Sequence, residues 1–132
     1  MRLDDPGLTS IKSPNVGNAR TLAVILMQTH HKSYEESLAE AIVILNDVKN
    51  HIKDNSDLTW VYYETVDDMR NEIDKYIVSF QNGSIKFLNE VNTHFAPTAA
   101  YQEHSMANDW TIEYHKLAER FDKIYDDLKK YG

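Results

Sequence analysis

The chain has 132 residues, a net charge of −7 from 21 acidic and 14 basic side chains, and no cysteine. A chain of this length suits one folded unit, and the lack of cysteine excludes disulfides and thiolate chemistry. The negative charge disfavours attraction to phosphate, so we expect neither a nucleic acid nor a membrane as a partner. The first residues lack the basic and apolar pattern of a secretory signal, which makes a cytoplasmic location the expectation.

The first seventeen residues hold two of the three prolines and two of the four glycines. These helix-breaking residues predict a loose N-terminal arm over residues 1–17, followed by a single helical domain over residues 18–132. The longest apolar run, residues 22–27, is far shorter than the roughly 20 residues of a membrane-spanning helix.

The first clear helix is predicted over residues 34–53, with Ser33 as its N-cap. Its apolar residues recur at the helical period on one face: Tyr34, Leu38, Ala41, Ile42, Leu45, Val48 and Ile52.

The next helix is predicted to begin after a cap at Ser56 or Thr65 and to end at Asn82-Gly83, where glycine suits a left-handed stop. Its stripe consists of Val66, Met69, Ile73, Tyr76, Ile77 and Phe80. A shorter helix then follows a cap at Ser84 and ends before Pro97, with Phe87, Leu88, Val91 and Phe95 as its apolar residues.

The last helix is predicted over residues 109–130, capped by Asn108 or Asp109. Its seam is formed by Tyr114, Leu117, Phe121, Ile124, Leu128 and Tyr131. Between the two final helices, residues 96–108 show no apolar stripe, so we expect a long, ordered crossover loop there.

Two segments, residues 21–30 and 58–65, are rich in β-branched and aromatic residues and could be helix or strand. If both were strands, the fold would be α+β, but two parallel strands alone have too little support. We therefore predict an all-α bundle of four to five helices.

Two acid–imidazole pairs are spaced by one helical turn, Asp47 with His51 and Glu90 with His94. Together they could supply four ligands to a metal ion, but an acid four residues before a histidine is also a common surface pair. No specific metal motif occurs, so the sequence favours no metal and no cofactor.

Residues 96–108 also contain a candidate acid–base pair, Glu103 and His104. The alternative function is therefore a small metal-binding protein or hydrolase-like enzyme that uses histidines and glutamates of the last two helices and this loop. These residues are His94, His104 and His115 with Glu90, Glu103 and Glu113. The same loop is better explained as a packed connection, and no glycine-rich or nucleophile motif supports catalysis.

The function favoured by the sequence is a small acidic module that binds a more basic protein, in the manner of an inhibitor, an immunity-type protein or an adaptor. The candidate partner-binding residues cluster around the second predicted helix: Asp57, Glu64, Asp67, Asp68, Glu72 and Asp74. The tyrosine-rich stripes also make a homodimer possible, because one bundle need not bury them all.

Overall fold

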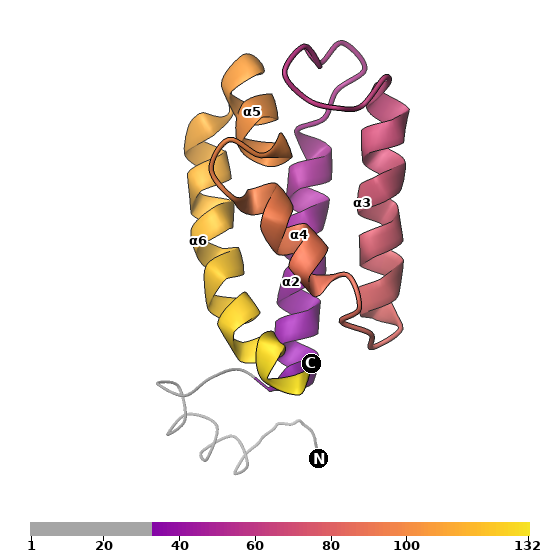
Figure 1. Ribbon diagram of the computed structural model, residues 1–132, viewed down its shortest axis with the longest axis vertical. Helices are drawn as coiled ribbons and strands as arrows, with labels where there is room; N and C mark the ends of the chain where they lie inside the picture. Colours follow the sequence, from indigo (N-terminus) through magenta and orange to yellow (C-terminus); the bar gives the residue numbers. More distant parts are fainter. Residues whose placement is uncertain (1–32) are drawn as a thin grey trace, which may run out of the picture. The chain divides into compact units, whose positions relative to one another are not determined.

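The computed structural model describes residues 33–132, and every regular element in that range is a helix (Figure 1). The elements are α2 (Tyr34–Asn50), α3 (Val66–Gln81), α4 (Leu88–Phe95), α5 (Ala100–Ala107), α6 (Thr111–Leu128) and the 3₁₀ turn η1 (Lys129–Tyr131). The all-α prediction is confirmed for this range. The predicted arm, residues 1–17, and the ambiguous segment 21–30 lie outside the described residues. Among residues 33–132, each helix is too short or too polar to cross a bilayer.

The start of α2 is fixed by a capping box, as the sequence predicts for Ser33. The Ser33 hydroxyl accepts a hydrogen bond from the Glu36 amide at 3.1 Å, and the Glu36 carboxylate accepts one from the Ser33 amide at 2.9 Å. Two backbone donors that a helix start leaves unpaired are thereby satisfied. The helix ends at Asn50, three residues before the predicted end.

The two ends of α3 also follow local chemistry. Thr65 caps the start by accepting from the Asp68 amide at 3.0 Å, whereas Ser56 caps no helix and instead accepts from the Lys53 amide. At the other end, Gly83 adopts a φ of +81°, and the amides of Gly83 and Ser84 donate to the carbonyls of Phe80 and Ser79. This is a Schellman stop, which requires a left-handed residue that glycine adopts without strain.

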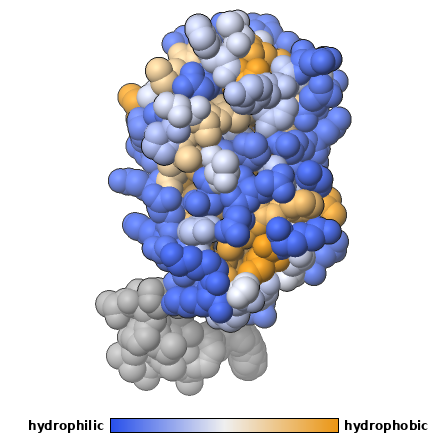
Figure 2. Space-filling view, viewed as in Figure 1, coloured by the Kyte–Doolittle hydropathy of each residue, from blue (hydrophilic) through white to orange (hydrophobic). Residues whose placement is uncertain are grey.

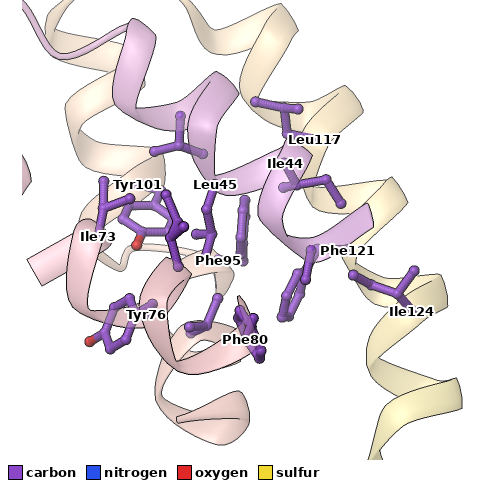
Figure 3. Close-up of a cluster of buried hydrophobic side chains, with 14 of the residues drawn as sticks. Ile44, Leu45, Ile73, Tyr76, Phe80, Phe95, Tyr101, Leu117, Phe121 and Ile124 are labelled. Atoms are coloured by element: carbon purple, nitrogen blue, oxygen red, sulfur yellow. The ribbon is translucent and has the colours of Figure 1, made fainter. Parts of the chain in front are cut away.

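Helix α2 lies between α3 and α6 and packs against both, while α4 and α5 cover one side of α6 (Figure 1). The core forms where these helices meet, and it is dominated by aromatic and branched side chains (Figure 3). Phe95 is central to it, because its ring lies 4.9 Å from the rings of both Tyr101 and Phe121. Each such side chain contributes about 1.5–3 kcal/mol by leaving water.

The predicted long crossover loop at residues 96–108 is wrong, because most of it is helix α5. The buried face of α5 consists of Tyr101, His104 and Ser105, two of which are polar, so no apolar stripe marks the helix in the sequence. The connection from α4 is short and holds Thr98 at a φ of 64°. Its amide donates to the Gln102 side chain at 2.5 Å, which ties the turn to α5.

Helix α6 matches its prediction within two residues, and its predicted seam is buried except for Tyr131. The predicted caps are wrong. Trp110 is the N-cap residue and makes no side-chain capping bond, while Asp109 takes a φ of 65° in the tight turn after α5.

Residues 58–65, the second segment that could be helix or strand, form neither. They belong to the connection between α2 and α3, residues 51–65, which we call the α2–α3 loop. It lies at the same end of the bundle as α5 (Figure 1).

Candidate functional site

The α2–α3 loop is ordered by hydrogen bonds to distant parts of the chain. The Asn108 side chain accepts from the Asp57 amide at 2.7 Å and donates to the Asp57 carbonyl at 2.9 Å. Arg70 on α3 donates to the Ile52 carbonyl at 2.8 Å and pairs with Asp54 at 2.9 Å. These contacts tie the loop to α3 and to the residue that follows α5.

Side chains alternate in direction along this loop. Val61 and Tyr63 are half-buried, whereas Trp60 is 69 % exposed and Tyr62 is fully exposed. Trp60 also lines a shallow hollow of about 370 Å³ together with Glu103, Met106 and Ala107 of α5. Figure 2 shows this end of the bundle, at the top, as pale, tan and orange atoms among blue ones.

Four of the six predicted partner-binding acids surround these aromatic residues in the sequence and are exposed: Asp57, Glu64, Asp67 and Asp68. Asp57 and Glu64 precede α3 rather than lying on it. Asp57 accepts from the amide and hydroxyl of Thr59, and these hydrogen bonds lower its pKa. Asp67 keeps an exposed contact with Arg70 at 3.3 Å. We call these four acids with Trp60 and Tyr62 the acidic–aromatic surface.

The other two predicted acids are engaged within the fold. Asp74 forms an ion pair with Lys49 of α2 at 2.7 Å. Glu72 accepts a short hydrogen bond from the Tyr63 hydroxyl, and its carboxylate lies 3.2 Å from Nε2 of His94. Both carboxylates therefore hold elements of the fold together.

Glu72 belongs to a polar cluster that joins the α2–α3 loop to α3 and α4. The Tyr76 hydroxyl donates to Glu90 at 3.0 Å and lies 3.0 Å from Nε2 of His94. Because a carboxylate can only accept, Nε2 of His94 carries the proton that it shares between Glu72 and the Tyr76 oxygen.

Burial, hydrogen bonds and charge together shift the pKa values of this cluster. The hydrogen bond from His94 is the main cause that lowers the pKa of Glu72. Burial, followed by interactions with Glu72, raises the pKa of Tyr63 and of Tyr76 well above the usual value. Both phenols thus stay protonated near neutral pH, where they act as donors and supply no nucleophile. The cluster anchors Tyr63 to α3 and so helps to position the exposed aromatic residues beside it.

The predicted acid–base pair is not brought together by α5. His104 is fully buried, and its Nδ1 accepts a hydrogen bond from Nε1 of Trp110 at 2.9 Å. Burial lowers the pKa of His104 to about 4, so the imidazole is neutral at pH 7. Glu103 is instead half-buried beside Trp60. His104 is therefore placed as a hydrogen-bond acceptor in the core.

The two predicted metal-binding pairs also have other partners. His51 stacks on the Trp110 ring at 4.5 Å and donates from Nδ1 to the Asp47 carbonyl at 2.8 Å, while the Asp47 carboxylate lies 3.7 Å from Arg120. Glu90 and His94 belong to the cluster with Tyr76. Within residues 33–132 no three histidine, aspartate or glutamate side chains are arranged to hold a metal ion.

The remaining candidates of the alternative function, Glu113 and His115, are exposed near the start of α6. His115 contacts the Tyr114 ring, whereas Glu113 lies beside a second hollow, also lined by His51 and Trp110.

Sequence reasoning missed the two exposed aromatic side chains. The sequence does hold one indication that they are exposed. A polar stretch, residues 53–57, is followed closely by Trp60 and Tyr62, which are two positions apart.

Comparisons of the chain with protein-family models, with curated proteins and with solved structures gave no match. No relative therefore assigns a role to the residues described above.

Proposed function

We propose that this chain is a protein-binding module whose acidic–aromatic surface docks on a more basic protein, as inhibitors, immunity-type proteins and adaptors do. The observation that carries the proposal is the exposure of Trp60 and Tyr62 on a loop held in place by Asn108, Arg70 and Tyr63. Tryptophan and tyrosine are the residues most often found at the energetic centre of protein interfaces. A loop that is ordered beforehand loses little entropy on binding, which favours affinity.

The charges around the two aromatic residues define the chemistry of the partner. Carboxylates that stay in solvent attract a positive surface over several ångströms and speed its approach, an effect that salt weakens. Arg70 offsets part of this charge through Asp54 and Asp67, whereas Glu64 and Asp68 form no ion pair within residues 33–132. We therefore assign affinity mainly to the aromatic residues and association rate mainly to the free carboxylates.

The test begins with the full chain as bait in an extract of its native host at low ionic strength. A basic protein that binds is then purified and its Kd measured against variants. Trp60→Ala with Tyr62→Ala should raise Kd by about 30-fold or more, the effect of losing an interface hot spot. Ile112→Ala is the matched control, because Ile112 is also 69 % exposed but lies at the start of α6.

The charge is tested separately by neutralising Glu64 and Asp68 to their amides. The association rate should fall and depend less on salt, whereas Glu119→Gln with Asp122→Asn, the same change of charge on α6, should leave it nearly unchanged. If no basic protein requires Trp60 and Tyr62, or if the chain recovers only copies of itself, the proposal fails.

A further inference from the structure

We propose a second binding site, for a small organic acid, in a groove between α3 and the segment that leads into α4. The groove has a volume of about 590 Å³ and lies away from the α2–α3 loop. Its principal lining residues are Lys75, Val78, Ser79, Asn82, Lys86 and Phe87. Figure 2 shows orange atoms over the lower half of α3 and the start of α4, with blue side chains beside them.

The groove has an apolar wall. Val78 is 52 % exposed, and the half-buried Phe87 ring is held by packing against the ring of Tyr76 at 5.5 Å. A fixed aromatic face beside an exposed aliphatic side chain suits the hydrocarbon part of a ligand.

Two ammonium groups converge on the same aromatic ring. Nζ of Lys75 lies 4.7 Å from the centroid of Phe87, and Nζ of Lys86 lies 5.1 Å from it. Attraction to the ring partly stabilises each cation, but the two cations repel one another. Neither lysine forms an ion pair within residues 33–132. An anion bound near both would remove this repulsion.

The one carboxylate that lines the groove does not neutralise these lysines by contact. Asp74 is paired with Lys49 of α2 at 2.7 Å. Lys75 does act on the Glu72 carboxylate at a distance, where it helps to lower its pKa, but Glu72 makes its own contacts with His94 and Tyr63. A local positive charge therefore remains in a chain of net charge −7.

Ser79 provides an independent indication of a ligand. Its side chain is only 7 % exposed and lines the groove, yet its hydroxyl has no hydrogen-bond partner within residues 33–132. Leaving a buried hydroxyl unpaired is unfavourable. The Ser79 hydroxyl is covered in the free chain, and a rotation of its side chain toward the groove would let a carboxylate oxygen accept from it.

These features together favour a ligand in which a carboxylate is attached to a small apolar or aromatic group. The carboxylate would accept from the two lysines and from Ser79, while the body would lie on Phe87 and Val78. The groove volume is in the range of small-molecule sites, which favours a free organic acid over a folded partner.

Phenylacetate is the probe, and it is titrated into the ¹⁵N-labelled full chain with two-dimensional NMR detection. The amides of Val78, Ser79 and Phe87 should shift and saturate below about 10 mM ligand, while phenylacetamide, which has the same ring but no charge, should bind at least fivefold more weakly. Equal binding of the two compounds, or no saturable shift with phenylacetate, would overturn the proposal. An acidic peptide that shifts these amides when phenylacetate does not would also overturn it, in favour of a macromolecular partner.

Variants distinguish binding in the groove from a non-specific effect of net charge. Lys75→Gln with Lys86→Gln should raise Kd for phenylacetate about tenfold, from roughly two- to fivefold for each exposed cation. Ser79→Ala should raise it about fivefold and leave the fold intact, because no internal hydrogen bond is lost. The control is Lys116→Gln with Lys123→Gln on α6, which changes the net charge equally. If this control weakens binding as much, the groove is not the site.

Discussion

Replacing His104 by asparagine should abolish a specific loss of stability in mild acid. In the native fold Nδ1 of His104 accepts the Trp110 indole hydrogen at 2.9 Å inside the core. A protonated imidazole carries hydrogen on both nitrogens, so it would present a donor to a donor. The asparagine carbonyl can occupy the place of Nδ1 and still accept from Trp110, but it does not titrate.

The size of the effect follows from the pKa of His104, which burial and the neighbouring charge of His51 lower from 6.5 to about 4. Between these pH values the unfolded chain binds a proton that the native chain resists, so stability falls as the pH decreases through this window. The contribution is negligible at pH 7, amounts to about 2 kcal/mol at pH 5, and levels off near 3 kcal/mol below pH 4.

Urea unfolding followed by circular dichroism at pH 7 and pH 5 measures this contribution. The free energy of unfolding of the wild type should decrease by about 2 kcal/mol more than that of His104→Asn over the interval. His115→Asn, at an exposed histidine, should decrease like the wild type. If the wild type and His104→Asn lose equal stability, or if NMR titration gives His104 a pKa above 6, the reasoning is refuted.

Two further substitutions test the contacts that define the fold. Ser33→Ala removes the capping box of α2 and should lower the free energy of unfolding by about 1 kcal/mol in chemical denaturation; an unchanged midpoint would show that water replaces the cap. Tyr114→Phe removes the buried hydrogen bond from the Tyr114 hydroxyl to the Phe95 carbonyl at 2.5 Å and should cost about 1–3 kcal/mol by thermal or urea unfolding. Tyr125→Phe, which loses an exposed bond to Asn89, is its control and should cost much less, so equal losses would contradict the argument.

The parts of the fold that could be predicted from sequence are those fixed by neighbouring residues. The caps at Ser33 and Thr65 and the stop at Gly83 each depend on contacts within a few residues, and all three are present. Helix α5 escaped prediction because His104 and Ser105 occupy its buried face, where a periodic pattern would need apolar residues. The shape of the α2–α3 loop depends on Asn108, which lies 51 residues from Asp57 in sequence. No local sequence pattern predicts that contact.

The candidate site divides in the same way. The sequence identified the acids near α3 as a group. In sequence Glu72 resembles Asp67 and Asp68, and only the structure shows that it is engaged by Tyr63 and His94. The convergence of two lysines on Phe87 is likewise a product of the turn between α3 and α4. The direction in which a side chain points depends on tertiary structure. The sequence therefore predicts the net charge of a surface better than it predicts which residues form that surface.

Asn108 links the stability of the α2–α3 loop to that of α5. Its side chain bonds both backbone groups of Asp57 and also the carbonyl of His104, one turn back in α5. Local opening of α5 would remove these contacts from the loop, so we expect amides of the two segments to exchange together. By mass action, a partner that binds only the ordered loop would also slow the exchange of amides in α5, although it touches none of them.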